Sequence, residues 1–221
     1  MNPILKRTIT GLAVGAAVIA AVLLAPPWAV MPAVAILIVL AFAEFCLLLR
    51  RKCPGFSPSW HLLCLLVGAA VIAFGLWALA EIALRHGNVI LLYIVAIVKF
   101  SDVGGFAFGI SSSKLMKGGN HKLCPSISPG KSWEGLLGSI LMSCVVSCVF
   151  LPFTGFSVGK ALAFGVAAAV FGTAGDLVES KFKRWVGVKD SSTMKITNGM
   201  GGVLDMLDSL LIAPAVLLPF I

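Results

Sequence analysis

The chain of 221 residues is 59% hydrophobic and only 12% charged, with a formal net charge of +8. A soluble domain carries about 25% charge, so this composition excludes a soluble globular enzyme and leaves no room for a separate soluble domain. The positive charge is confined to a few loops, which suits membrane surfaces and phosphate ligands and does not indicate nucleic acid.

Several apolar runs approach the ~20 residues that a helix needs to cross a bilayer, and they predict an all-α, polytopic membrane protein. The seven predicted membrane segments cover residues 9–24, 28–49, 62–84, 89–100, 136–153, 158–178 and 203–220. Residues 1–100 then form an N-terminal group of membrane helices. Residues 101–221 form a C-terminal membrane region that contains two long polar loops.

Basic residues predict the orientation of these segments. With the N-terminus in the cytoplasm, the loops on that side hold 14 of the 17 Lys and Arg residues, and the opposite orientation reverses the ratio. The positive-inside rule therefore favours a cytoplasmic N-terminus. We expect an integral protein of a bacterial-type inner (plasma) membrane, with both long polar loops, 111–132 and 179–202, facing the cytoplasm.

Two carboxylates, Glu44 and Glu81, lie inside the second and third apolar segments. Such residues pair with a basic group, line a cavity or lie near an interface, because an isolated charge in a membrane is costly. Neither belongs to a recognisable motif. We predict a structural or interfacial role for both.

The fourth segment ends with an unusual polar sequence, in which Lys99 and Asp102 precede the glycine pair Gly104-Gly105. Adjacent glycines weaken a membrane helix and allow another backbone to approach closely. We predict a half-buried site here. The alternative is an internal Lys99–Asp102 ion pair that only stabilises the helix end.

The first polar loop contains the sequence ISPGKSWEG at 127–135. Ser128, Gly130, Lys131 and Ser132 place hydroxyls, backbone N–H groups and an ammonium next to a predicted helix start, near Ser132. A helix N-terminus binds phosphate through its free N–H groups. The spacing is not that of a Walker A loop. The alternative is an ordinary turn that caps the fifth segment.

Four acidic residues lie at the ends of the last two apolar segments. Asp176 and Glu179 end one segment, and Asp205 and Asp208 begin the next. Each pair has i,i+3 spacing, so its members share one face of a helix. Carboxylates with water and phosphate oxygens are the ligands that Mg²⁺ prefers, and two metal ions together stabilise phosphoryl or nucleotidyl transfer. We therefore predict a magnesium site for phosphate chemistry at the membrane surface.

The second polar loop adds positive charge and glycine between these acidic pairs. Its basic residues would neutralise phosphates or, alternatively, anchor the loop at the membrane surface: Lys181, Lys183, Arg184 and Lys189. Gly201 and Gly202 allow the backbone to approach a ligand closely before the last segment begins.

Three blocks in the C-terminal half, taken together, resemble the phosphatidate cytidylyltransferase (CDP-diacylglycerol synthase) family. They are SDVGGFAFG at 101–109, ISPGKSWEG at 127–135 and the long stretch 175–209, close to the signature S-x-x-K-R-x4-K-D…H-G-G-x-x-D-R-x-D. The positions that match the signature are Ser180, Lys183, Arg184, Lys189, Asp190, Gly201, Gly202, Asp205 and Asp208.

The resemblance implies transfer of CMP from CTP to phosphatidic acid, with a polar cavity open to the cytoplasm and sideways to lipid. It implies a divalent-metal centre at Asp176, Asp205 and Asp208, to which we add Glu179, and it makes Lys131 a catalytic residue. We expect Mg²⁺, in a two-metal arrangement; the sequence does not decide on a monovalent ion or a homodimer. The residues assigned to substrate binding are Ser128, Gly130, Ser132, Lys183, Arg184, Lys189, Asp190, Gly201, Gly202 and Asp102.

The chain departs from the signature at two side chains that carry chemistry. Met200 replaces its histidine and Met206 replaces its arginine, while Asn198 stands where a proline is common. Methionine neither donates a proton nor binds phosphate, so either the two family side chains are dispensable here or the activity is altered. The retained carboxylates, lysines and glycines favour retained activity. Two alternatives stay open: a CTP-dependent transferase or kinase acting on an isoprenoid alcohol, and a transporter or inactive relative.

Overall fold

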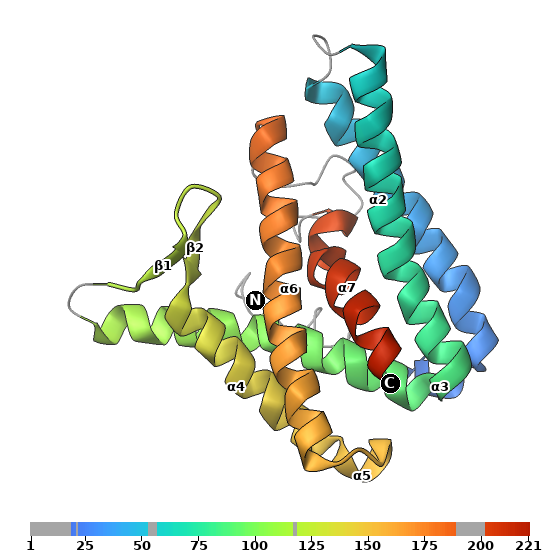
Figure 1. Ribbon diagram of the computed structural model, residues 1–221, viewed down its shortest axis with the longest axis vertical. Coiled ribbons are helices and arrows are strands. Elements are labelled where there is room, and N and C mark those ends of the chain that lie inside the picture. Colours follow the sequence, from blue (N-terminus) through green and yellow to red (C-terminus); the bar gives the residue numbers. More distant parts are fainter. Residues whose placement is uncertain (1–18, 21, 53–56, 117–118, 189–201) are drawn as a thin grey trace, which may run out of the picture.

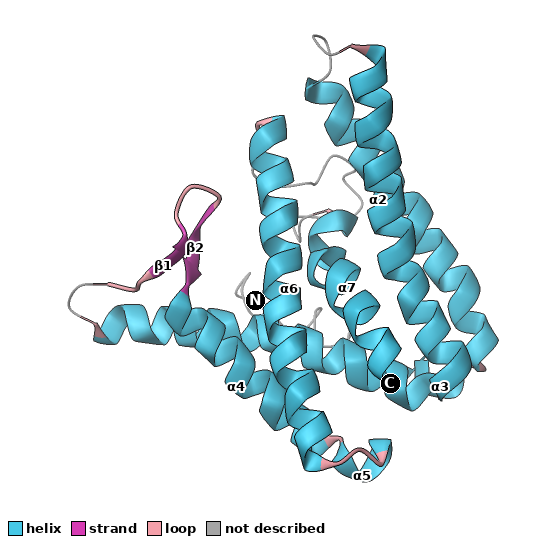
Figure 2. Cartoon of the chain, in the orientation of Figure 1, coloured by secondary structure: helices cyan, strands magenta, loops and turns pink. Residues whose placement is uncertain are grey.

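The computed structural model describes residues 19–20, 22–52, 57–116, 119–188 and 202–221. The part described is helical except for one small hairpin (Figure 2). Its elements are η1 (Pro27–Ala29), α2 (Val30–Lys52), α3 (Pro58–Leu115), β1 (Lys122–Cys124), β2 (Ser128–Ser132), α4 (Trp133–Val149), α5 (Leu151–Thr154), α6 (Val158–Val186), α7 (Val203–Leu217) and η4 (Leu218–Phe220).

Helices α6 and α7 lie side by side in the middle of the molecule (Figure 1). Helix α2 and the first part of α3 cover one side of this pair. The second part of α3 crosses beneath it and leads to α4 and the hairpin on the other side. Segments from both halves of the sequence therefore surround the two central helices.

Helix α3 changes direction at Gly87, whose φ of 83° and ψ of 170° are not helical. A positive φ is strained for most residues and free of that strain for glycine. The predicted third and fourth membrane segments are the two arms of α3, 58–86 and 88–115, on either side of this residue. The N-terminus of the first arm is capped by Ser57, whose hydroxyl accepts a hydrogen bond from the Trp60 N–H at 3.4 Å.

Four helices in the described residues are long and apolar enough to cross a membrane, and the chain is a helical membrane protein. They are Pro27–Arg50, Ser59–Leu115, Val158–Val186 and Val203–Phe220. They contain the predicted segments 28–49, 62–84, 89–100, 158–178 and 203–220. The fifth predicted segment, 136–153, is the shorter helix α4, and most of the first lies outside the described residues. The total of seven and the cytoplasmic N-terminus stay predictions.

Small residues allow α4 to pack closely on the second arm of α3. A Cβ atom at Gly104 would lie 2.5 Å from the Gly138 carbonyl oxygen, so the two backbones nearly touch. The hydroxyl of Ser143, which is fully buried on α4, donates a hydrogen bond of 2.9 Å to the Ile97 carbonyl. Small residues and interhelical hydrogen bonds of this kind stabilise helix pairs in membranes. This packing fixes the position of α4 and of the hairpin that precedes it.

Candidate active site

The contact between α6 and α7 brings Asp176 and Asp208 together. A Cβ atom at Gly175 would lie 2.5 Å from the Asp208 carbonyl oxygen, so only glycine permits this helix spacing. The two carboxylates interact directly, and Asp208 Oδ1 also accepts a hydrogen bond of 2.6 Å from the Ser209 N–H. The sequence predicted these two side chains at one site, and the structure places them together.

The other two acids, Glu179 and Asp205, form a separate cluster one turn away on the same helices. The Lys183 ammonium lies 2.6 Å from Glu179 Oε2 and 2.8 Å from Asp205 Oδ1. Asp205 Oδ2 accepts a further hydrogen bond of 3.0 Å from the Gly202 N–H. Lys183, predicted to bind substrate phosphate, therefore lies between two carboxylates and connects α6 to α7.

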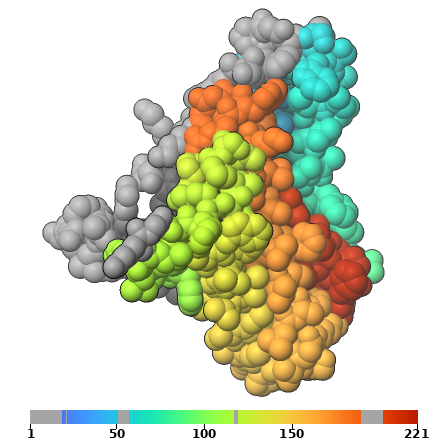
Figure 3. Space-filling view, turned by 60° about the vertical axis from the view of Figure 1, so that its left-hand side comes forward, coloured from blue at the N-terminus to red at the C-terminus, as the bar shows by residue number. Residues whose placement is uncertain are grey.

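The hairpin contributes Lys131, whose ammonium lies 2.5 Å from Asp176 Oδ2. Figure 3 shows the yellow-green hairpin region in front of the orange helix α6, where this ion pair forms. The alternative of an ordinary turn that caps the fifth segment holds only in part, because residues Ser128–Ser132 form strand β2 before the helix begins. The predicted helix start at Ser132 is confirmed: its hydroxyl accepts a hydrogen bond of 3.1 Å from the Gly135 N–H.

The second arm of α3 reaches α7 through three polar side chains. Lys99 Nζ donates hydrogen bonds of 2.9 Å to the Met206 carbonyl and to Ser209 Oγ. The Ser209 hydroxyl donates to Asp102 Oδ2 at 3.0 Å. Lys99 Nζ and Asp102 Oδ2 are 3.6 Å apart and form the ion pair of the alternative interpretation. The pair does more than stabilise the helix end, because both side chains are about one-third exposed and also bond to α7, as in the predicted half-buried site.

A polar cavity of about 540 Å³ lies between the hairpin, α4, α6 and the second arm of α3. It brings together the predicted substrate-binding residues of the first loop and two of the acids. Its lining includes Asp102, Ser128, Gly130, Lys131, Ser132 and Asp176. The three blocks that seemed separate in the sequence therefore meet in space, apart from the loop that precedes α7.

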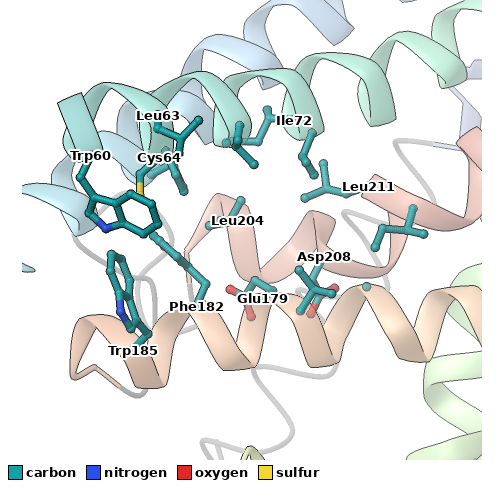
Figure 4. A pocket seen from close by; sticks show the side chains of 17 residues that line it. Trp60, Leu63, Cys64, Ile72, Glu179, Phe182, Trp185, Leu204, Asp208 and Leu211 are labelled. Carbon is teal, nitrogen blue, oxygen red and sulfur yellow. The ribbon is translucent and has the colours of Figure 1, made fainter.

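An apolar groove of about 340 Å³ lies on the other side of the carboxylate pair, between the first arm of α3 and helices α6 and α7. Figure 4 shows Trp60 and Trp185 at one end and Ile72 and Leu211 toward the other. The carboxyl groups of Glu179 and Asp208 lie along the side formed by α6 and α7. Asp176 lines the polar cavity while Asp208 lines this groove, so their contact is where the two hollows approach each other.

Glu134, in the first turn of α4, holds the hairpin in place. Its Oε1 accepts hydrogen bonds from the His121 N–H at 3.1 Å and from His121 Nδ1 at 2.7 Å. These bonds lower the pKa of Glu134 to about 2. Because this pKa is below the unfolded value of about 4.3, the contribution to stability is complete above that value and is lost as pH falls toward 2.

Several predicted residues cannot be placed at this site. Arg184 lies near the end of α6, and its guanidinium donates a hydrogen bond of 3.4 Å to the Val188 carbonyl. Lys189, Asp190, Gly201 and the substituted position Met200 lie outside the described residues. Met206 is described and 46% exposed, with its carbonyl bound to Lys99.

The donor set at Asp176 and Asp208 fits a divalent cation. Within the described residues, no three acidic, histidine or cysteine side chains are arranged to hold a metal ion. Magnesium needs only one or two carboxylates when water and phosphate oxygens complete its coordination. Two carboxylates in contact repel each other unless they share a proton or a cation lies close to them, so this pair can accept a metal ion. Glu179 and Asp205 fit a second ion only if Lys183 releases them.

The sequence profile of the Cytidylyltransferase family matches residues 54–221, which include the four acidic residues, the hairpin and the whole lining of the polar cavity. The chain belongs to the cytidylyltransferase family. It is 39% identical over 136 residues to a phosphatidate cytidylyltransferase of Haemophilus influenzae, covering 57% of this chain and 43% of that protein.

Two staphylococcal proteins of the same name give similar matches. The Staphylococcus aureus protein is 44% identical over 121 residues, which is 54% of this chain and 44% of that protein. The Staphylococcus saprophyticus protein is 38% identical over 146 residues, which is 65% of this chain and 53% of that protein. The chain spans about half the length of these curated relatives.

Sequence reasoning missed one residue of this site and gave two others only a general role. Lys99 was predicted to belong to a half-buried site with Asp102, but without its partners on α7. Ser209, on α7, was given no role, yet its hydroxyl bonds to both Lys99 and Asp102 beside Asp208. Glu44 lies outside the family match and was predicted to be structural. All three are polar residues inside an apolar run. This pattern indicates that the side chain makes a buried contact, but it does not indicate with which residue.

Proposed function

We propose that the chain transfers CMP from CTP to phosphatidic acid, producing CDP-diacylglycerol and pyrophosphate. The observation that carries this proposal is the Asp176–Asp208 contact between a polar cavity and an apolar groove. A reaction between a soluble nucleotide and a lipid phosphate needs one reacting centre with access from both kinds of surroundings. The family and the names of the relatives support the same reaction.

The polar cavity suits the nucleotide. Its volume of about 540 Å³ is in the usual range for a small-molecule site. Lys131 supplies a positive charge, and the hydroxyls of Ser128 and Ser113 supply hydrogen-bonding groups along the wall. We propose that this cavity binds CTP from the cytoplasmic side of the inner membrane.

The apolar groove suits an acyl chain of the lipid. Trp60, Leu63, Val67 and Phe182 are among the apolar side chains that line it, and it reaches Asp208. An acyl chain in this groove would stay in apolar surroundings as it leaves the bilayer, while the lipid phosphate would lie beside the carboxylate pair. We propose that phosphatidic acid enters from the membrane along this groove.

The reaction is a single in-line displacement at phosphorus. A phosphate oxygen of phosphatidic acid attacks the α-phosphorus of CTP, and the bond from that phosphorus to the oxygen bridging to the β-phosphate breaks. Pyrophosphate leaves with the bonding electron pair. A phosphate monoester is already largely ionised at neutral pH, so no strong general base is needed.

The residues of the site would orient and neutralise the phosphates. Asp176 and Asp208 would hold Mg²⁺, which supplies Lewis-acid stabilisation of the phosphate charge. Lys131 would move from Asp176 Oδ2 to a phosphate oxygen when CTP binds, which places its charge near the leaving pyrophosphate. Lys99 and Ser209 keep the Asp208 turn in position through the contacts described above.

Pyrophosphate release tests the proposal. Purified protein in detergent with Mg²⁺, CTP and dioleoyl phosphatidic acid should release pyrophosphate, and Asp208→Asn should lower the rate by at least about a hundredfold. Glu81→Gln is a matched control, because Glu81 pairs with Arg85 on the first arm of α3. It should retain activity.

Two results would contradict the proposal. Wild-type rates in both Asp176→Asn and Asp208→Asn would remove the carboxylate pair from the reaction. Turnover that requires an isoprenoid alcohol in place of phosphatidic acid would assign a different acceptor to the same fold.

A further inference from the structure

A buried carboxylate from outside the family match touches the helix that carries Asp205 and Asp208. Glu44, on α2, is 1% exposed, and its Oε2 accepts a hydrogen bond of 2.8 Å from the Leu204 N–H. The two residues are 160 positions apart. The family profile begins at residue 54, so this contact is not part of what the family match describes.

The Leu204 N–H belongs to the first turn of α7, where N–H groups have no partner within the helix. A carboxylate at this end is favourable because it satisfies a donor and complements the positive end of the helix dipole. Leu204 directly precedes Asp205, and Asp208 follows one turn later. A shift of this first turn would therefore move both carboxylates.

Two further contacts restrain the same region. Lys183 bonds to Asp205 from α6, while the Phe45 ring, next to Glu44, stacks on Phe182 with centroids 4.8 Å apart. Helix α2 thus contacts α6 through an aromatic pair and α7 through a hydrogen bond. The aromatic contact sets the distance between α2 and α6, and the hydrogen bond holds the start of α7 in place.

We propose that Glu44 is a positioning residue, which sets the start of α7 and thereby the location of Asp208 against Asp176. Its catalytic consequence rests on the proposed function. The carboxylate does not touch substrate; it acts through the Leu204 N–H. The oxygen acceptor is the property required of this side chain, so glutamine should replace it and methionine should not.

Hydrogen exchange measures the positioning directly. In Glu44→Met, the backbone amides of 203–206 should exchange roughly tenfold faster than in the wild type, because the Leu204 N–H has lost its acceptor. Glu44→Gln keeps an acceptor at the same reach and should exchange within about twofold of the wild type.

Turnover should follow the same order. Glu44→Met should lower kcat by roughly tenfold or more while the KM for CTP changes by less than about twofold, because the polar cavity is untouched. Glu44→Gln should restore kcat to near the wild-type value. If Glu44→Met does not fold, Glu44→Asp tests the same point, because it keeps the charge but is too short to reach Leu204.

Leu48→Ala is the matched control. Leu48 is fully buried on the same helix, and its truncation destabilises the protein without removing the Leu204 hydrogen bond. It should lower the melting temperature but leave exchange at 203–206 and kcat near wild-type values. Equal effects in Leu48→Ala and Glu44→Met would overturn the proposal, as would wild-type exchange in folded Glu44→Met or Glu44→Asp.

The exchange measurement separates this inference from the reaction. If the wild-type protein releases no pyrophosphate, the proposed function fails, and the exchange rates still decide whether Glu44 positions α7. If pyrophosphate is released and exchange is unaltered by Glu44→Met, only the positioning role fails.

Discussion

At the scale of single residues, the site depends on charges that compensate one another. Asp176 contacts Asp208, and the Lys131 ammonium 2.5 Å from Asp176 offsets part of the negative charge. Both members of this ion pair are about one-fifth exposed, so solvent can reach them. A group that balances carboxylates in this way is also available to a phosphate, because both ligands present anionic oxygens.

Replacing Lys131 should therefore weaken nucleotide turnover more than it weakens the fold. We expect Lys131→Met to lower kcat/KM for CTP by about a hundredfold in steady-state pyrophosphate release. Lys114→Met is the control, because Lys114 lies in the last turn of α3 and does not line the polar cavity. Equal rates for wild type and Lys131→Met would show that this ammonium serves only Asp176.

Sequence patterns identified the chemistry of single residues better than their partners. The i,i+3 spacing of the acids at two helix ends predicted that each pair shares one face of its helix and that the two helix ends form one site. It did not predict that Asp176 contacts Asp208 while Glu179 and Asp205 bind Lys183. The partners of Glu44 and Lys99 are 160 and 107 or more positions away. Contacts between residues so far apart in the sequence depend on how the helices pack, and this packing cannot be read from the residues that neighbour each of them in the sequence.

At the scale of elements, the decisive feature is the close approach of α6 and α7. Their backbones nearly touch at Gly175, which places the second turn of α7, at Asp208 and Ser209, against α6. The long apolar runs predicted the two helices but not how closely they pack. The hairpin was also missed, because Ser128–Ser132 has the composition of a turn and forms a strand only by pairing with β1.

A methyl group at Gly175 should separate the two helices. We expect Gly175→Ala to destabilise the protein by roughly 1–3 kcal/mol and to reduce pyrophosphate release, because the added Cβ would lie 2.5 Å from the Asp208 carbonyl. Thermal unfolding in detergent should show a lower melting temperature. Gly159→Ala in the same helix meets no atom within 4 Å and should be neutral or slightly stabilising. A Gly175→Ala protein with wild-type stability and activity would contradict the packing argument.

At the scale of the whole molecule, two hollows of opposite character approach one pair of carboxylates. The N-terminal helices supply one wall of the groove through Phe45 on α2 and the first arm of α3. The hairpin, α4 and the second arm of α3 supply the walls of the polar cavity. Because α3 changes direction at Gly87, its first arm lines the groove and its second arm lines the polar cavity. The sequence indicated this change of direction only as a short break between two apolar segments.

If each substrate binds in its own cavity, a substitution in one cavity should weaken the binding of one substrate and leave the binding of the other unchanged. Val67 lines the groove and is 55% exposed, so Val67→Trp should occupy space needed by an acyl chain. We expect it to raise the KM for dioleoyl phosphatidic acid roughly fivefold or more, with the KM for CTP nearly unchanged. Ser113→Trp, in the polar cavity, should do the reverse. The measurement is steady-state pyrophosphate release with each substrate varied in turn.

The crossed design makes the outcome decisive. If both substrates shared one cavity, either tryptophan would raise both KM values together. If the groove did not bind lipid, Val67→Trp would leave both values unchanged while Ser113→Trp still affected CTP. Only opposite, independent effects fit a transferase in which nucleotide and lipid reach the Asp176–Asp208 pair from different sides, because each added indole then blocks one route and leaves the other open.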